Sequence, residues 1–251
     1  MILAVDIGNT NIVIGGIDNE IKFVSRMATD KNRTEFEYAV MLSGFLNMHN
    51  VGDIEGAIIS SVVPPLTTVM KKAVYRICGK NPLIVGPGIK TGLDIKTENP
   101  SALGSDLVVD AVAALAEYAP PLIVIDMGTA TTMSVIDKNS RYIGGVIIPG
   151  IIVSQNALSA NTSQLPYIDI SGPEKVIGKN TVECMKSGMI LGAAAMIDGM
   201  IDRIHEELGE KAAVIATGGL SGMIVPHCRR DIIYDCDLLL KGLYILFRKN
   251  N

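Results

Sequence analysis

The chain has no tryptophan and only four phenylalanines among its 251 residues. Large aromatic side chains provide the surfaces on which proteins stack unpaired bases, so their scarcity argues against single-strand nucleic-acid binding. The charge balance is mildly acidic, with 22 lysines and arginines against 26 acidic residues and a formal net charge of −4. This balance lacks the excess of basic residues with which proteins bind nucleic acids or anionic membranes. We therefore expect neither to be a partner.

Long apolar runs and paired cysteines are missing too. No stretch approaches the ~18–20 apolar residues that cross a bilayer. The start, MILAVDIGN, has no basic residue and meets an acid at position 6, unlike a signal peptide. The four cysteines show no CxxC spacing, which argues against a zinc site and predicts reduced thiols in the cytoplasm. They are Cys78, Cys184, Cys228 and Cys236.

Two common nucleotide-binding signatures are also absent. The chain has no GxGxxG fingerprint, which weighs against a Rossmann dehydrogenase. The segment GPEKVIGKNT at 172–181 is similar to a P-loop, but five residues instead of four separate its glycines. Asn180 also stands where a P-loop needs Ser or Thr, so we reject this interpretation.

What the chain does have is 48% hydrophobic residues and an alternation of short β-rich runs with helical patterns. This pattern predicts an α/β protein with an ample core. The predicted strands cover 2–5, 11–17, 20–26, 56–60, 83–85, 122–125, 131–136, 142–148, 213–216 and 231–234. The predicted helices cover 33–48, 64–77, 104–118, 150–159, 181–208 and 238–247, with a turn-rich segment at 86–100.

An internal repeat is the most informative feature. ILAVDIGNTNIVIGGI from Ile2 matches LIVIDMGTATTMSVID from Leu122, and both place an Asp-x-Gly turn after an apolar strand. Three opening strands followed by a helix occur in the same order in both parts. We therefore predict a duplication, with two α/β halves at 1–119 and 120–251 and the two turns meeting in a cleft.

These turns suit phosphate binding. Glycine lets the backbone approach a ligand, and the amides of Gly8, Asn9 and Thr10 can point at phosphate oxygens. Asp6, at the end of its strand, can hold a hydrated Mg²⁺ ion. One such turn has an ordinary structural explanation, but a duplicated pair favours a polyphosphate held from two sides. The equivalent turn residues of the second half are Gly128, Thr129, Ala130 and Thr131.

A third glycine cluster lies between a predicted strand and a predicted helix. Gly218 and Gly219 follow Thr217 there, and we expect a nucleotide's sugar or base to lie against their backbone. The alternative is an ordinary strand-to-helix turn.

Six motifs together resemble the type III pantothenate kinase family over nearly the whole chain. They are DIGNT at 6–10, GSD at 104–106, DMGTATT at 126–132, GGVIIPG at 144–150, GKNT at 178–181 and TGG at 217–219. The resemblance implies a duplicated actin-like, ribonuclease H-like ATPase fold. It also implies ATP-dependent phosphorylation of pantothenate to 4′-phosphopantothenate in coenzyme A synthesis, by a cytoplasmic homodimer that uses Mg²⁺ and K⁺ or NH₄⁺.

The resemblance also suggests roles for individual residues. Asp6 resembles the carboxylate that organises Mg²⁺, Asp126 the ligand of the monovalent cation, and Thr129 an ATP contact. Asp106 resembles the general base that accepts the proton of the acceptor hydroxyl. Its place near a helix N-terminus favours the charged form, although a first-turn acid can also simply stabilise its helix. The positions that match the pantothenate site are Gly104, Ser105 and Thr181.

The acceptor half of the pattern departs from the family. Leu107 stands where the family has an arginine, and leucine cannot make a charge-assisted contact with an anionic acceptor. Thr97 stands where the family usually has an aromatic residue, and SANTSQLP from Ser159 lacks an arginine found there. Two alternatives therefore stay open: a paralogue that phosphorylates another small alcohol, or a catalytically weak nucleotide-binding regulator. We expect the small residues between Gly188 and Gly199 to form the dimer interface.

Overall fold

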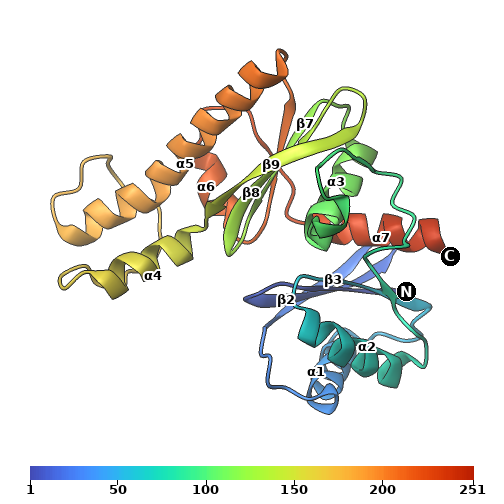
Figure 1. Ribbon diagram of the computed structural model, residues 1–251. Helices are drawn as coiled ribbons and strands as arrows, with labels where there is room; N and C mark the ends of the chain where they lie inside the picture. The colour runs from blue at the N-terminus through green and yellow to red at the C-terminus, as the bar shows by residue number, and fades with distance from the viewer. The chain divides into compact units, whose positions relative to one another are not determined.

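The computed structural model describes residues 1–251, and the chain forms two compact units. The first unit comprises Met1–Leu93, Glu98–Ala116 and Leu238–Asn251, and the second comprises Asp94–Thr97 and Glu117–Asp237. Each unit is built around one β-sheet with helices packed against it (Figure 1).

The first unit contains a five-stranded sheet in the order β3-β2-β1-β4-β5. β1 is antiparallel to β2 and parallel to β4, so it lies at the centre of the sheet. All six residues of β1 are buried, as expected for a central strand that reads as an apolar run. The strands are β1 (Ile2–Ile7), β2 (Asn11–Asp18), β3 (Glu20–Ala28), β4 (Gly56–Ser61) and β5 (Leu83–Ile84).

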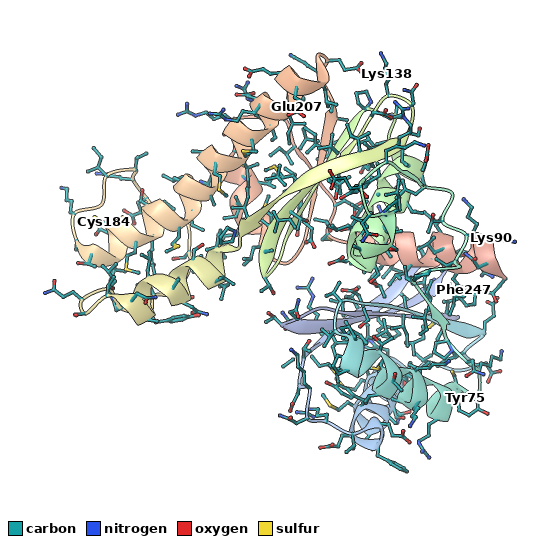
Figure 2. The ribbon with its side chains drawn as sticks, in the orientation of Figure 1. Tyr75, Lys90, Lys138, Cys184, Glu207 and Phe247 are labelled. Atoms are coloured by element: carbon teal, nitrogen blue, oxygen red, sulfur yellow. The ribbon has the colours of Figure 1, made fainter.

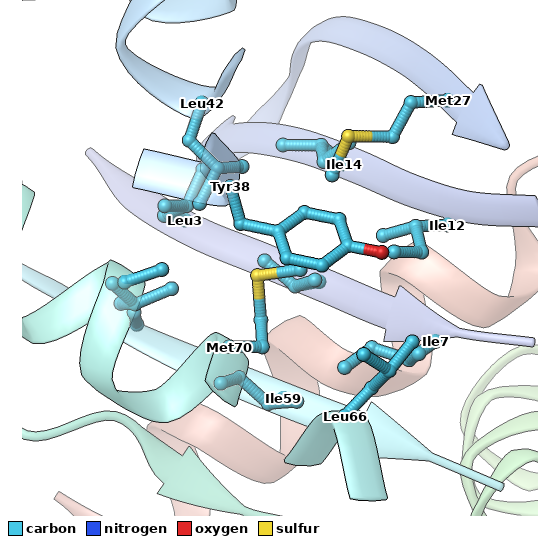
Figure 3. Packing of buried hydrophobic residues seen from close by; sticks show 14 of the residues in the cluster. Leu3, Ile7, Ile12, Ile14, Met27, Tyr38, Leu42, Ile59, Leu66 and Met70 are labelled. Atoms are coloured by element: carbon cyan, nitrogen blue, oxygen red, sulfur yellow. The ribbon is translucent and has the colours of Figure 1, made fainter. Parts of the chain in front are cut away.

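Separate hydrophobic clusters cover this sheet. One contains residues of α1 (Glu35–Met48) and α2 (Pro64–Cys78), and Figure 3 shows Tyr38 of α1 at its centre. The Tyr38 hydroxyl donates to the Asp30 carbonyl oxygen at 2.7 Å, so this buried polar group is satisfied. The other cluster contains residues of α3 (Ser105–Glu117) and the C-terminal helix α7 (Leu238–Asn250).

The second unit repeats the first sheet. Its order, β11-β10-β7-β8-β9-β6, places β9-β8-β7-β10-β11 in the arrangement of β3-β2-β1-β4-β5, with the same parallel and antiparallel pairs. The duplication predicted from the sequence is therefore present in the topology. The strands are β6 (Asp94–Ile95), β7 (Leu122–Met127), β8 (Ala130–Ile136), β9 (Arg141–Pro149), β10 (Ala213–Thr217) and β11 (Ile233–Tyr234).

The second unit has three α-helices: α4 (Ile151–Asn161), α5 (Thr181–Leu208) and the short α6 (Ser221–Ile224). α5 begins at the Asn180 cap and ends at Gly209, whose φ of 72° suits glycine. By length and composition alone α5 could cross a membrane. However, its side chains at 190, 194, 197 and 201 are buried in the core of this unit, and a core helix passes the same test.

The predicted strands and helices are confirmed, with shifts of one to three residues at their ends. Two short elements in the turn-rich 86–100 region and just after it were missed: β6, and a 3₁₀ turn at Pro100–Ala102. The compact units also differ from the predicted halves. α7 belongs to the first unit because Leu240, Leu243 and Leu246 are buried in the cluster that includes Ile2 and Ala4 of β1.

Candidate active site

The first Asp-x-Gly turn joins β1 to β2. Asp6 is 9% exposed, one residue before the end of β1. The Gly8 amide donates to the Asn11 carbonyl oxygen at 3.0 Å, which closes the turn. Thr29, just after β3, forms two hydrogen bonds to the turn. Its amide donates to the Thr10 carbonyl oxygen at 2.9 Å, and its hydroxyl donates to the Gly8 carbonyl oxygen at 2.7 Å. Asn9 and Thr10 remain exposed, so their backbone is accessible to a ligand.

A cluster of hydroxyl groups joins the end of β4 to the start of α3. Ser60 pairs in register with Asp6 and is fully buried. The Ser105 oxygen lies 3.1 Å from the Ser60 hydroxyl, 3.1 Å from the Ser61 amide nitrogen and 3.1 Å from the Ser61 carbonyl oxygen. The structure therefore brings Asp6 and the GSD motif to the same end of the first sheet.

Asp106 is the second residue of α3 and is half-buried. Its Oδ1 accepts from the Leu107 amide at 2.8 Å. Burial raises the pKa of Asp106 above its usual value, against the lowering effect of the backbone amides. From the sequence, the helix start was expected to favour the charged form of Asp106. The amides do so, but desolvation has the larger effect.

Gly104 leaves room for this carboxylate. A Cβ atom at position 104 would lie 2.4 Å from Asp106 Oδ1, so a side chain there would displace this carboxylate. Leu107 follows Asp106 in the first turn of α3 and is half-buried. Gly104, Ser105, Asp106 and Leu107 therefore lie together in the first unit.

The second Asp-x-Gly turn joins β7 to β8 in the same way. The Gly128 amide donates to the Ala130 carbonyl at 2.9 Å, and the Gly150 amide donates to the Thr129 carbonyl at 3.1 Å. Gly150 has to be glycine here, because a Cβ atom would lie 2.3 Å from the Thr129 oxygen. The last glycine of GGVIIPG thus supports the turn of DMGTATT.

The TGG motif packs against this second turn. Thr217 pairs in register with Asp126, and Gly218 has a φ of 94°, which favours glycine. A Cβ atom at position 218 would lie 2.3 Å from Asp126 Oδ1 and 2.6 Å from the Met127 amide nitrogen. The structure thus brings together Asp126, Gly128, Thr129 and Gly218, with Gly219 the next residue along.

The remaining predicted residues lie elsewhere in the second unit. Thr131 is buried on β8 and lines a cavity of about 300 Å³ together with Met127. Thr97 lies two residues after β6, at the edge of the sheet. Thr181 begins α5 and lines an adjoining groove of about 640 Å³ with Leu158 and Met185. Figure 2 shows Cys184, which also lines this groove, near the start of α5 and Glu207 near its end.

Thr29, Ser60 and Ser61 were not predicted from the sequence to belong to the site. A signal for the serines was present: two consecutive serines end a buried apolar strand just before a Val-Val-Pro-Pro segment. Buried hydroxyls at such a position need partners. Nothing local indicated that Ser105 would be the partner, because 44 residues separate it from Ser61.

Two units with one repeated sheet, each with an Asp-x-Gly turn, define the duplicated actin-like ATPase fold. Solved structures support this class. A protein assigned to the Baf family of transcriptional activators, from Campylobacter jejuni, has a TM-score of 0.61 at 19% identity, over 99% of this chain and 98% of that one. The 2-hydroxyisocaproyl-CoA dehydratase activator from Clostridium difficile, with bound ADPNP, has a TM-score of 0.57 at 12% identity, over 98% and 94%.

Sequence comparison gives the family. The model of type III pantothenate kinase matches residues 2–203. A type III pantothenate kinase from Exiguobacterium sibiricum is 46% identical over all of both chains. Another from Bacillus cytotoxicus is 43% identical over all of this chain and 97% of its own. The chain belongs to the type III pantothenate kinase family.

Proposed function

We propose that this protein transfers the γ-phosphoryl group of ATP to pantothenate, giving 4′-phosphopantothenate for coenzyme A synthesis. The observation that carries this proposal is the 46% sequence identity to a type III pantothenate kinase over the full length of both chains. The actin-like fold and the preserved Asp-x-Gly turns support the use of ATP.

Asp106 is proposed to act as the general base. Phosphoryl transfer depends on positioning and on neutralising charge, so a carboxylate that aligns the acceptor hydroxyl and accepts its proton is sufficient. The acceptor oxygen then attacks the γ-phosphorus as the bond to the β,γ-bridging oxygen breaks. The raised pKa of Asp106 supports this role, since it makes the carboxylate a better proton acceptor.

Each turn is proposed to hold phosphate oxygens through its backbone, the first at Asn9 and Thr10 and the second from Thr129 to Thr131. Gly8 and Gly128 are proposed to let the backbone come close to these oxygens, but their own amides close the turns and do not point at phosphate as the sequence suggested. Gly218 and Gly219 are proposed to lie against the nucleoside.

Two cations are part of the proposal. Asp6 has the donor chemistry for Mg²⁺, since its carboxylate is nearly buried at a strand end beside exposed turn amides. No group of three or more His, Cys, Asp or Glu side chains forms a metal site. Mg²⁺ often binds through one or two carboxylates together with phosphates and water, so Asp6 could supply the protein ligand while ATP supplies the phosphates. Asp126 is proposed to hold K⁺ or NH₄⁺, and bound cations would neutralise charge on the phosphates.

We propose that the protein is a cytoplasmic homodimer whose interface includes α5. Gly188 and Gly192 support this, because a Cβ atom at either position would meet nothing within 4 Å. Several apolar side chains of α4 and α5 are also exposed, among them Ile152, Val153, Leu158 and Val182. Sedimentation velocity of Gly192→Leu tests the interface: a folded monomer supports it, and an unchanged dimer contradicts it.

Leu107 favours a second candidate function, in which the acceptor substrate is not pantothenate. Its apolar side chain offers no charge to a carboxylate, so another small alcohol remains a candidate substrate, as does a regulator that binds nucleotide without turnover.

One assay separates these candidates. Purified protein is incubated with ATP, Mg²⁺ and K⁺, with pantothenate or another small alcohol, and phosphorylated product is measured by mass spectrometry. K⁺-dependent 4′-phosphopantothenate supports the proposal, and Na⁺ in place of K⁺ serves as the cation control. Turnover with another alcohol only points to a paralogue. ATP binding by calorimetry with no turnover on any acceptor points to a regulator.

A further inference from the structure

The hydroxyl of Ser105 is fully used inside the first unit. A serine hydroxyl can donate one hydrogen bond and accept two. Ser105 donates to the Ser61 carbonyl and accepts from the Ser61 amide, both at 3.1 Å. Its one remaining site is an acceptor, so the contact with the Ser60 oxygen at 3.1 Å requires Ser60 to be the donor. The Ser105 oxygen has no capacity left for a substrate.

Ser61, the β4 residue to which Ser105 bonds, is itself fixed by hydrogen bonds. The Ser61 hydroxyl accepts from the Thr67 hydroxyl at 2.8 Å and from the Val63 amide at 3.2 Å. Thr67 lies in the first turns of α2, and Ser61 ends β4. Ser105 therefore joins the start of α3 to a point fixed by a strand and a second helix.

This anchor lies beside the carboxylates of the proposed site. Ser60 and Ser61 pair in register with Asp6 and Ile7. Ser105 is directly followed by Asp106, whose carboxylate is set by the Leu107 amide and by the space at Gly104. Strand pairing and three hydroxyl contacts thus connect Asp6 to the first turn of α3.

We propose that Ser105 is a positioning residue, not an acceptor contact: its hydroxyl, held by Ser60 and Ser61, fixes the first turn of α3 and with it the carboxylate of Asp106. This inference rests on the proposed kinase function. It replaces the role that the family resemblance implied for Ser105, which was to line the acceptor site. A displacement of about 1 Å in a catalytic group can cost about 100-fold in rate.

The test compares Ser105→Ala, Ser60→Ala and the double variant in the full-length protein. We expect both single variants to lower kcat by about 10- to 100-fold, with the KM for ATP and for the acceptor changed less than about threefold. Ser60 is fully buried and cannot touch the acceptor. It also pairs with Asp6, so a loss of kcat with an unchanged KM for ATP is the result that assigns its effect to Ser105. The double variant should resemble the single ones, because residues of one network are not additive.

Ser134→Ala is the matched control. Ser134 is also buried, and its hydroxyl lies 3.1 Å from the Tyr142 hydroxyl in the second unit. Its loss removes a comparable buried hydrogen bond and should leave kcat within about twofold. If Ser105→Ala instead raises the KM for the acceptor and keeps kcat, Ser105 contacts the substrate and the inference is wrong. An unchanged kcat in Ser60→Ala would also overturn it.

A second readout does not need turnover. Carboxyl NMR titration of Asp106 should give a lower pKa in Ser105→Ala than in the wild type, because a loosened first turn exposes the carboxylate to water. An unmoved pKa contradicts the positioning role. If the wild-type protein shows no turnover but this pKa change is present, the proposed function is wrong and the positioning role of Ser105 still holds.

Discussion

The two Asp-x-Gly turns have the same place in the same sheet but are supported differently. In the first unit, Thr29 follows the third strand and bonds to the turn through both its amide and its hydroxyl. In the second unit, Gly150 has this position and uses only its amide. The second turn is one residue shorter between its paired strand ends, and its carbonyls crowd position 150.

The residues beside each aspartate differ as well. Next to Asp6 is Ser60, whose hydroxyl contacts the helix that carries Asp106. Next to Asp126 are Thr217 and the close-packed Gly218. The first unit is thus built to hold a carboxylate in place. In the second unit, Gly218 lets the backbone pass close to Asp126. The two copies of the sheet therefore carry different residues around their aspartates.

The largest effect is expected from Asp106→Asn, which removes the proposed general base. General bases contribute about 10²- to 10⁴-fold, so kcat should fall by that factor while the KM for ATP stays within about threefold. Steady-state kinetics measure both values. Unchanged kcat would remove the base role.

The same variant should not lose stability. The pKa of Asp106 is raised in the folded protein, so its charged form is disfavoured there at neutral pH. The stability from this shift is present below the unfolded pKa and is lost as pH rises through the folded pKa. The melting temperature of Asp106→Asn at pH 7 should therefore equal or exceed that of the wild type. A clear decrease would show that the carboxylate stabilises its helix.

Gly218→Ala should have the next largest effect. The substitution forces a Cβ atom against Asp126 at a φ of 94°, and such strain costs about 1–3 kcal/mol of folding free energy. We expect this loss in denaturant unfolding, with a KM for ATP raised about tenfold or more. Gly128→Ala is the control beside the same aspartate, because a Cβ atom there would lie no closer than 3.8 Å to any atom. Equal losses in both variants would contradict the close packing of the TGG motif against Asp126.

Thr29→Val tests the extra support of the first turn. It removes the hydroxyl that donates to the Gly8 carbonyl and keeps the side-chain shape. A hydrogen bond of this kind contributes about 1 kcal/mol, so we expect that loss of stability and a few-fold higher KM for ATP. Thr29→Ser retains the hydroxyl and should restore both values. If valine has no effect, the amide of residue 29 alone supports the turn, as in the second unit.

The smallest effect on stability is expected at the turns that join the second and third strands of each sheet, β2 to β3 and β8 to β9. They contain Asn19 and Ser140, both at positive φ. In the turn that contains Ser140, Arg141 and the amides of residues 139 and 141 lower the pKa of Asp137 to about 2. This contribution to stability is present above the ordinary pKa near 3.8 and is lost as pH falls toward 2. Asp137→Asn should therefore be less stable than wild type at pH 7 but not at pH 2, by thermal unfolding. A constant difference would assign the effect to packing.

Much of the fold was predictable because its signals are local. Apolar strands ended by Asp-x-Gly, the Pro64-Pro65 helix start and the long apolar pattern of α5 each depend on neighbouring residues. The positions of Asp6, Asp106 and Asp126 at strand or helix ends followed from these elements. β6 has two residues and was missed, because so short a strand is defined only by its pairing with β9.

The sequence by itself determined the repeated frame and its chemistry, since hydrophobic periodicity and turn residues act over a few positions. Only the tertiary structure decided which distant groups share a site: Ser105 with Ser60 and Ser61, Gly218 with Asp126, and α7 with the first sheet. Such contacts arise from the packing of side chains far apart in the chain, which no local pattern specifies. The same packing reversed the expected electrostatics of Asp106, because desolvation depends on everything that surrounds the carboxylate.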